Sequence, residues 1–442
     1  MAIYDAFFVN GKFVPQLLGE FILEQNSFIT LRESEETFVL RDGYYQPFAK
    51  SFIEERCNEL LAAQVSDHYV LETLHYIKRA TYSDVIEPPL NLINLENGVL
   101  DRNTLELTPH EQCPYAFFQQ LPVRYDPKAT CPNIDAFIIE VVDNENDRNT
   151  LYEVPGFCLK REYKPGRALM LIGKTQNGKT TYLLLITAFL GLRNIASKTL
   201  QRLITDKFSR EALFGKLANI SAELPAVNLT ETEGFKTLTG GDVIDGEKKF
   251  KNSFNFFNYA KLLFACNKLP EVPENESLAY FQRWTMLQFI HTFEGDKCKP
   301  HILDTLTTPE ELSGFLNKAL KGLKRLEENG DFSHKATIAE KKKQYVSISN
   351  PSICFIEEFL DFDIQAKTSK KDLGEAFDKY CIDKNLPNPG YVSFFIHFSK
   401  YIKEHGLYIG ELREGTEGRV LSGVALLKEQ KVEEKGALDQ YV

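Results

Sequence analysis

The chain has 442 residues, of which 26% are charged and 43% hydrophobic, and its formal net charge is −10. This length predicts two or three domains, one of them large enough for a complete α/β core. The acidic balance excludes a diffuse basic surface, so any contact with nucleic acid must come from a local cluster of lysines or arginines. The eight cysteines are scattered without a Cys-x-x-Cys pair, which indicates reduced thiols in a cytoplasmic protein and argues against a zinc site.

The N-terminal sequence has no basic start followed by an apolar core, and no apolar run reaches the length of a bilayer span. We therefore expect no secretion signal and no membrane partner. Residues 1–150 form a first unit of mixed α/β or helical character, with helical periodicity in 48–64 and 67–82 and a hairpin around an Asn-Gly in 92–101.

Residues 151–300 alternate strands and helices in the manner that builds a parallel sheet. The predicted core strands are 168–172, 216–221, 262–266 and 285–290. A helical linker is expected over 301–349, and 350–442 shows the helix and strand order of a winged-helix-like module. The fold class is therefore α/β.

The stretch ALMLIGKTQNGKTTYLLLITAFLG joins an apolar strand to a helix through a loop that begins at Gly173. A loop of this kind turns its main-chain N–H groups inward, next to a helix N-terminus, and so predicts a phosphate site for ATP. Lys179 is expected to reach the outer phosphates and the Thr180 hydroxyl to hold Mg²⁺. The predicted nucleotide contacts are Gly173, Lys174, Thr175, Gln176, Asn177, Gly178, Lys179, Thr180 and Thr181.

Two later strands end in polar residues that suit ATP hydrolysis. Glu223 follows the second predicted core strand, where a carboxylate positions the attacking water and helps to hold magnesium. The preceding position is Ala222, which leaves the magnesium environment open, and a helix-capping role for Glu223 is the alternative. Asn267 follows the third strand, where an amide can sense the γ-phosphate. An Asn after a single strand is more often a turn residue, but its place in this series of strands favours the sensor.

Basic residues lie between and after these strands. Lys248, Lys249 and Lys251 cluster at an expected hairpin tip and are candidate contacts to a DNA backbone, with a solvated loop as the alternative. Arg283 comes directly before the last core strand. Its guanidinium is expected to reach the γ-phosphate of a neighbouring subunit, which implies a ring-closing interface.

The ordered set of "NGKT", the strand ending in Glu223, "LTGGD" with its lysines, "ACNKLP" and "FQRW" resembles the superfamily 3 helicases. The resemblance is greatest to the poxvirus-type nucleoside triphosphatase branch found in phage and plasmid primase-helicases. "NGVLD", "YDPKATCP" and "GFCL" look like the N-terminal helicase-associated region of that branch. The likeness is specific over roughly residues 90–300.

This resemblance implies an AAA+-like P-loop core in residues 151–300, a helicase-associated domain in 1–150 and a winged-helix domain in 350–442. It implies a homo-oligomer, a hexameric ring, that moves 3′ to 5′ on single-stranded or forked DNA, in the host cytoplasm if the chain is viral or plasmid-borne. Lys248 or Lys249 matches the pore-hairpin base. We expect no primer synthesis by the chain itself, and a separate primase or polymerase is a candidate partner.

Other nucleotide enzymes fit less well. A small-molecule kinase has no need of a basic hairpin, and a GTPase would carry an Asn-Lys-x-Asp base reader where "CNKL" stops one residue short. The alternative that stays open is a replication initiator or loader that assembles on DNA with ATP and does not unwind it processively.

Overall fold

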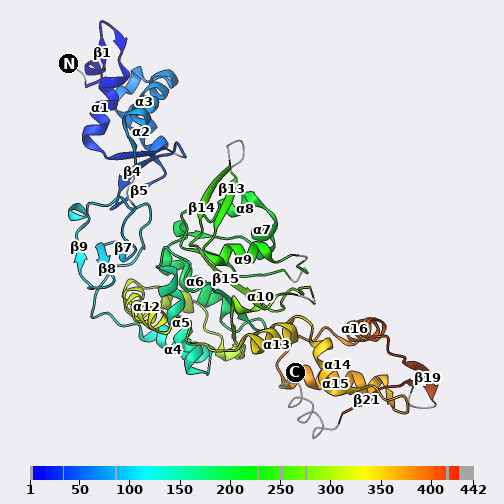
Figure 1. The fold of residues 1–442 in the computed structure, drawn as a ribbon. Helices are drawn as coiled ribbons and strands as arrows, with labels where there is room; N and C mark the ends of the chain where they lie inside the picture. The colour runs from blue at the N-terminus through cyan, green and yellow to red at the C-terminus, as the bar shows by residue number, and fades with distance from the viewer. Residues whose placement is uncertain are drawn as a thin grey trace.

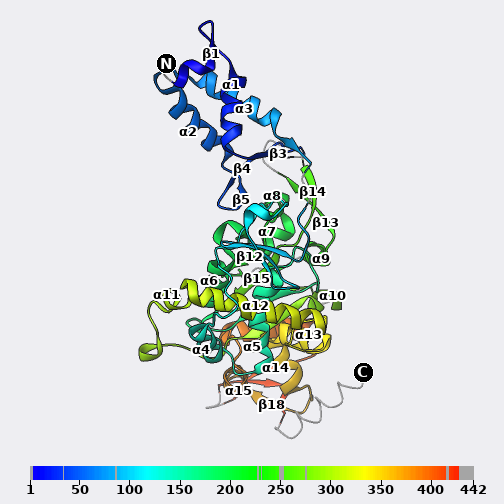
Figure 2. The ribbon, with the colours of Figure 1, turned by 90° about the vertical axis from the view of Figure 1, so that its left-hand side faces the viewer.

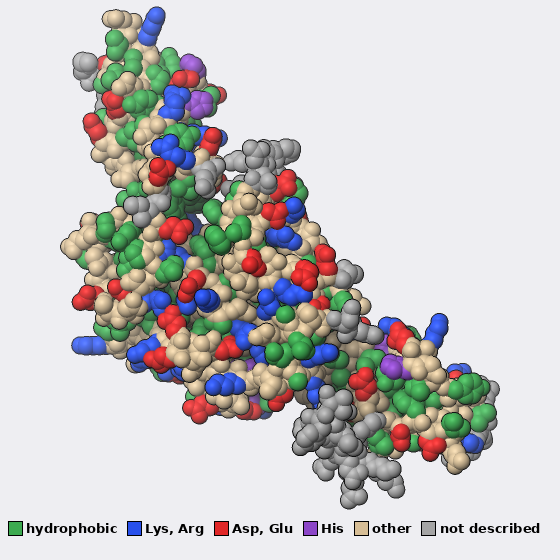
Figure 3. All heavy atoms as spheres, viewed as in Figure 1, with side chains coloured by type: hydrophobic (Ala, Val, Ile, Leu, Met, Phe, Trp, Pro, Cys, Tyr) green, Lys and Arg blue, Asp and Glu red, His purple; other side chains and the backbone are tan. Residues whose placement is uncertain are grey.

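The computed structural model describes residues 3–427 except 33, 85–86, 226–227, 230, 248–252, 274–275 and 415–417. The chain forms an elongated molecule in which an N-terminal part, a central α/β part and a C-terminal part follow one another in space (Figure 1). Acidic and basic side chains are mixed over the face shown in Figure 3, as the modest net charge predicts.

The N-terminal part has its own small core, separate from the core of the rest of the chain. Leu18, Ile22, Ile53 and Ile77 belong to it and are almost fully buried. The sheet order is β5-β4-β3-β6. The elements are η1 (Ile3–Phe7), β1 (Phe8–Val9), β2 (Lys12–Phe13), α1 (Pro15–Gln25), β3 (Phe28–Leu31), β4 (Thr37–Arg41), β5 (Tyr44–Gln46), α2 (Ala49–Leu61), η2 (Ala62–Gln64), α3 (Asp67–Ala80) and β6 (Tyr82–Ser83).

The predicted Asn-Gly hairpin is confirmed: β7 (Leu92–Leu95) pairs antiparallel with β8 (Gly98–Asp101). After it come β9 (Leu107–Thr108), η3 (His110–Gln112), α4 (Pro132–Val141) and α5 (Glu145–Cys158). The two helices pack against the central part through the long amphipathic helix α12 (Pro309–Asn329) (Figure 2).

The centre of the molecule is a five-stranded parallel sheet with the order β11-β12-β15-β10-β16. The strands are β10 (Ala168–Ile172), β11 (Ile195–Ala196), β12 (Ala218–Ser221), β15 (Lys261–Cys266) and β16 (Trp284–Gln288). Every residue of β10, β12 and β15 is buried, because a parallel sheet is covered by helices on both faces. The four predicted core strands are confirmed, 168–172 with the same ends and the other three with shifted ends, whereas β11 was not predicted.

Helices and a hairpin connect these strands or follow the last of them. They are α6 (Lys179–Leu190), η4 (Leu192–Asn194), α7 (Leu200–Thr205), α8 (Lys207–Glu211), α9 (Glu233–Gly240), β13 (Val243–Glu247), β14 (Ser253–Phe257), α10 (Leu278–Gln282), η5 (Gly295–Lys297) and α11 (Ile302–Leu306). The antiparallel pair β13 and β14 projects from the central part (Figure 1).

The C-terminal part follows α13 (Ile338–Ser349) and begins with α14 (Pro351–Phe359). Phe355, Phe377 and Phe394 form its centre, and the rings of the last two stack at 4.4 Å. A three-stranded sheet of order β18-β20-β19 covers one side. The remaining elements are β17 (Leu360–Asp361), β18 (Lys367–Ser369), α15 (Lys370–Asp383), α16 (Tyr391–Glu404), β19 (Gly410–Glu414), β20 (Gly418–Ser422) and β21 (Ala425–Leu426).

Glycines allow α5 and α12 to approach closely. A Cβ built on Gly322 would lie 2.5 Å from the Tyr152 carbonyl oxygen, and one on Gly156 would lie 2.3 Å from that of Ala319. Both contacts are with main chain, which cannot turn away as a side chain can. The distance between the two helices therefore depends on the absence of these side chains.

We predict that Gly322→Ala lowers the free energy of unfolding by about 1–3 kcal/mol, because the added methyl forces two packed helices apart. Urea unfolding followed by circular dichroism measures the change. Lys324→Ala, at an exposed position of the same helix, is the matched control and should stay within about 0.5 kcal/mol of the unmodified chain. Equal stability of both variants would contradict the packing argument.

Candidate functional site

Three segments meet at the carboxyl edge of the sheet. β15 lies between β12 and β10, so the loops that follow these three strands are neighbours. Two main-chain hydrogen bonds join them: Gly173 donates to the Cys266 carbonyl at 3.3 Å, and Leu224 donates to the Ala265 carbonyl at 3.0 Å. The structure thereby brings the predicted residues Glu223 and Asn267 to the same edge as Gly173.

The glycine loop, residues 173–178, leads from β10 into α6. Within the described part of the chain, the main-chain N–H groups of 174–178 have no hydrogen-bond acceptor. Gly178 has a φ of +89°, a left-handed conformation that favours glycine, and a Cβ there would lie 2.7 Å from Val141. The free N–H groups lie next to the N-terminus of a twelve-residue helix. Such a loop is chemically suited to hold an anion.

The side chain of Asn177 holds the loop in shape. It is 3% exposed, its Nδ2 donates to the Phe289 carbonyl at 2.8 Å, and its Oδ1 accepts from Lys179 Nζ at 2.9 Å. The Gln176 carbonyl accepts from the Phe293 N–H at 2.7 Å. These contacts come from the segment after β16, more than 100 residues away, and no sequence spacing indicated them.

Lys179 folds back over the loop. Its Nζ also donates to the carbonyls of Gly173 and Lys174, at 2.7 and 2.6 Å. Burial lowers the pKa of this ammonium group to about 8. Because no carboxylate is among these partners, an anion bound at the loop would be the first negative charge to stabilise the ammonium form.

The other predicted nucleotide contacts are open to solvent. Lys174, Thr175, Gln176 and Thr180 are exposed, and Thr181 is half-buried. Glu223 and Asn267 are exposed as well, so each can meet a ligand at this edge. A hydroxyl on α6 and a carboxylate after β12 match the oxygen ligands that Mg²⁺ takes together with phosphates and water. Among the described residues, no group of three or more His, Cys, Asp or Glu side chains could hold a metal ion unaided.

Arg283 lies at the opposite edge of the sheet. Its carbonyl accepts from the N–H of Ala168, at the first residue of β10, whereas the glycine loop begins after the last. At about 3.3 Å per residue, the length of β10 places about 13 Å of strand between them. Its Nη1 donates to the Ala279 carbonyl at 2.9 Å, and its Nε is buried without a hydrogen-bond partner among the described residues. Arg283 therefore cannot complete the site of its own chain.

The three lysines of the predicted hairpin tip, Lys248, Lys249 and Lys251, lie outside the described residues. The strands on either side of them are described, and they pair in register from Val243 with Phe257 to Glu247 with Ser253. The hairpin is thus confirmed, and contact of its lysines with DNA stays a prediction.

Apolar residues of α4 pack behind the glycine loop, and no sequence pattern predicted this contact. Val141 and Phe137, both on α4, face Gly178. The N-terminus of α4 is capped by Glu311 of α12, whose carboxylate accepts from the N–H groups of Asn133 and Ile134 at 3.1 Å each. The apolar residues of α4 lie at helical spacing, but that spacing does not indicate which element covers them.

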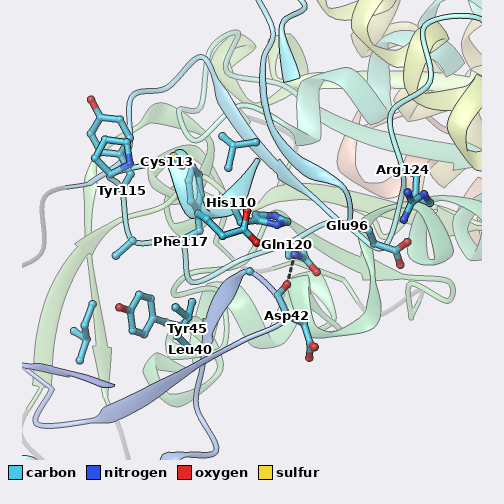
Figure 4. Close-up of a pocket in the computed structure, with 16 residues that line it drawn as sticks. Leu40, Asp42, Tyr45, Glu96, His110, Cys113, Tyr115, Phe117, Gln120 and Arg124 are labelled. Atoms are coloured by element: carbon cyan, nitrogen blue, oxygen red, sulfur yellow. Dashed lines mark hydrogen bonds between the residues drawn. The ribbon is translucent and has the colours of Figure 1, made fainter. Parts of the chain in front are cut away.

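A separate open pocket of about 850 Å³ lies between the N-terminal sheet and the β7–β9 sheet (Figure 4). Asp42, His110 and Gln120 line it, and Gln120 Nε2 donates to the Asp42 carbonyl at 2.6 Å. His110 Nε2 lies 2.8 Å from Asn94 Oδ1 and is thus held by its own chain. None of the predicted site residues lines this pocket.

The central part is therefore a parallel α/β fold with a glycine loop whose N–H groups are free, and with a carboxylate and an amide at the same edge of the sheet. Two family models match parts of the chain: "Family of unknown function (DUF5906)" over residues 171–283, and "D5 N terminal like" over residues 25–143. The second match supports a relationship to viral primase-helicase proteins and a role connected with replication. No curated protein matches the chain.

Solved structures of the NrS-1 C-terminal region resemble this chain over most of its length. The apo structure of residues 305–718 has 12% identity and a TM-score of 0.50, covering 93% of this chain and 99% of that one. One A-form apo structure has 12% identity and a TM-score of 0.51, and a second A-form apo structure has 14% identity and a TM-score of 0.50. Both matches cover 93% of this chain and 100% of the solved chain. At this identity the likeness shows a shared mixed α/β fold. Of the helices that the structure describes, none has the length and apolar character needed to cross a bilayer.

We predict that Asn177→Ala lowers the free energy of unfolding by about 1–3 kcal/mol, because the buried Phe289 carbonyl and Lys179 each lose a hydrogen-bond partner. Thermal unfolding of the ligand-free chain measures this. Thr175→Ala, in the same loop but exposed, is the matched control. An Asn177→Ala chain as stable as the control would show that the loop does not depend on this side chain.

Proposed function

We propose that the chain is an ATP-dependent DNA helicase of the superfamily 3 type, which assembles into a hexameric ring and moves 3′ to 5′ on single-stranded DNA during replication of a virus, phage or plasmid. The observation that carries the proposal is the convergence of the glycine loop, Glu223 and Asn267 on three adjacent parallel strands. Kinases and GTPases share such a loop, but a small-molecule kinase has no need of a basic hairpin, and the Asn-Lys-x-Asp base reader of a GTPase is incomplete in "CNKL".

In this proposal ATP binds with its phosphates at the free N–H groups of the glycine loop, and Lys179 turns toward the outer phosphates. Thr180 and Glu223 hold Mg²⁺, directly or through water, and the metal offsets phosphate charge when bound. The exposed Glu223 carboxylate orients and deprotonates the attacking water. The Asn267 amide reports whether the γ-phosphate is present.

Arg283 acts in trans. Its position at the far edge of the sheet supports this role, because a neighbouring subunit that packs against that edge would bring its own nucleotide to the guanidinium. Each site then needs two chains, so hydrolysis and assembly depend on each other.

DNA contact is assigned to two places. Lys248, Lys249 and Lys251, which come between β13 and β14 in the sequence, would bind the phosphate backbone of the DNA strand. The C-terminal part would be the second place, as a winged-helix module. Its order of elements supports this: helix α14, strand β18, helices α15 and α16, then strands β19 and β20.

The alternative is an ATP-regulated initiator or loader with the same site. It would bind and hydrolyse ATP on DNA but would not separate strands. Strand displacement on a forked duplex distinguishes the two functions.

We predict ATP hydrolysis that single-stranded DNA stimulates several-fold at low salt, with displacement of a strand from a forked duplex. Lys179→Ala should lose nucleotide binding, because the outer phosphates lose their cation. Glu223→Gln should bind ATP and hydrolyse it about 10²- to 10⁴-fold more slowly, as loss of a general base implies. Steady-state phosphate release and a gel assay of strand displacement measure these properties.

The matched control is Glu231→Gln, an exposed carboxylate in the segment after β12, which should hydrolyse ATP normally. Normal hydrolysis by Glu223→Gln would move the base to another acid. Stimulated hydrolysis without strand displacement would favour the loader. No ATP binding by the unmodified chain would overturn the proposal.

We also predict that nucleotide binding takes up a proton in alkaline solution. The pKa of Lys179 is about 8 in the ligand-free chain, and bound phosphates should return it toward the ordinary 10.5. Affinity should therefore be constant below pH 8 and fall by up to tenfold per pH unit from pH 8 toward pH 10.5. Calorimetry with a non-hydrolysable ATP analogue, at pH 9 in buffers of different ionisation enthalpy, counts the protons.

Proton uptake approaching one per site is expected at pH 9 and almost none at pH 7, which serves as the internal control. Equal affinity at pH 7 and pH 9 without proton uptake would mean that Lys179 does not meet the phosphates as an ammonium ion.

A further inference from the structure

A buried tyrosine of α13 lies between the loop that carries Asn267 and the segment that carries Arg283. Tyr345 is 1% exposed, and its ring packs edge-on against Tyr280 of α10, with centroids 5.5 Å apart and planes at 79°. It meets Phe281 in the same way, at 5.5 Å and 74°. α13 is thus fixed to the short helix that ends directly before Arg283.

Hydrogen bonds of two tyrosine hydroxyls join α10 and α13 to the loop that carries Asn267. Tyr345 Oη donates to the Pro270 carbonyl at 2.9 Å, and the hydroxyls of Tyr345 and Tyr280 lie 3.0 Å apart. A carbonyl only accepts, so Tyr345 gives its proton to Pro270 and accepts that of Tyr280. Pro270 is three residues after Asn267. If the Asn267 loop moves, Tyr345 and Tyr280 must move with it, or the hydrogen bonds between Pro270, Tyr345 and Tyr280 break.

Two basic side chains bind the main chain directly before Arg283. The Gln282 carbonyl accepts from Arg167 Nη1 at 2.7 Å and from Lys341 Nζ, one turn before Tyr345, at 3.4 Å. Arg167 itself donates three hydrogen bonds to the Asp331 carboxylate, at 3.0, 3.2 and 2.6 Å. Tyr345 therefore contacts the first residue of the short segment 280–282, and Arg167 and Lys341 bind its last residue.

Tyr280 also touches the helix that leads to the hairpin. Its ring lies 5.3 Å from that of Phe235 on α9 and 6.0 Å from that of Trp284, and Phe235 stacks on Trp284 at 4.4 Å and 16°. α9 precedes β13, the first hairpin strand. One buried aromatic cluster thus contacts the Asn267 loop, the Arg283 segment and α9, the helix that precedes the hairpin.

We propose that Tyr345 is a positioning residue whose hydroxyl transmits the state of the Asn267 loop to Arg283 and to the hairpin. This inference rests on the proposed function, since it assigns a coupling between the parts of that site. A hydroxyl pair in a buried, low-dielectric setting is suited to the task, because leaving any of its groups unpaired is unfavourable and the segments must move together.

The chain carries a single tryptophan, Trp284, and it lies in this cluster. Its fluorescence can therefore report the coupling without an added label. We expect a non-hydrolysable ATP analogue with Mg²⁺ to change Trp284 emission in the unmodified chain. Tyr345→Phe, which keeps the ring and removes the hydroxyl, should bind the analogue within twofold of the unmodified affinity and show less than half of the emission change.

The kinetic counterpart is a double-mutant cycle. Tyr345→Phe should lower kcat for ATP hydrolysis by about fivefold or more with little change in KM, because the guanidinium is misplaced and nucleotide binding is intact. In an Arg283→Ala background the same change should have no further effect, since a positioning residue acts only through the group it positions.

Tyr163→Phe is the matched control. Tyr163 is buried in the same core and its hydroxyl accepts from the Leu262 N–H at 3.1 Å, at the start of β15 and away from α13. It should lose stability as Tyr345→Phe does and keep the full emission change and kcat. A full emission change in Tyr345→Phe, or additive effects of Tyr345→Phe and Arg283→Ala, would overturn the inference. If the unmodified chain binds no nucleotide, it is the proposed function that fails.

Discussion

The parallel pairing of β15 with β10 on one side and β12 on the other is the constraint on which the candidate site depends. Parallel strands end at the same edge, and their hydrogen bonds hold the three following loops in register. Glu223, Asn267 and the glycine loop meet for this reason alone, although 94 positions separate Gly173 from Asn267. The same geometry sends Arg283, which precedes its strand, to the other edge.

The glycine loop is supported by elements that lie far from it in the sequence. Asn177 is held by the segment after β16, and Gly178 faces α4, which Glu311 of α12 caps in turn. The loop leaves its own N–H groups free for a ligand, so its shape depends on these distant contacts together with the hydrogen bonds of Lys179. Residues near 130–141 and 309–329 therefore belong to the site as much as the motif does.

Periodicity and turn chemistry predicted much of the central part. The strand at 168–172 agrees with β10, and the Asn-Gly hairpin was found from its turn residues. β11 has two residues and leaves no pattern that a sequence can reveal. The partners of Tyr345 were equally hidden, because its position in "EKKKQY" indicates a solvated helical face, whereas the structure buries the ring against Tyr280.

The sequence by itself determined the local chemistry: a flexible glycine loop before a helix, a carboxylate and an amide after apolar strands, and a parallel α/β class. These follow from residue types and from spacings of a few positions, over which the backbone has few conformations. Only the tertiary structure decided the order of the strands, the separation of Arg283 from its own loop and the covering of α4 and α13. Such choices depend on which apolar faces pack together, and packing between distant segments is not encoded in any short stretch of the chain.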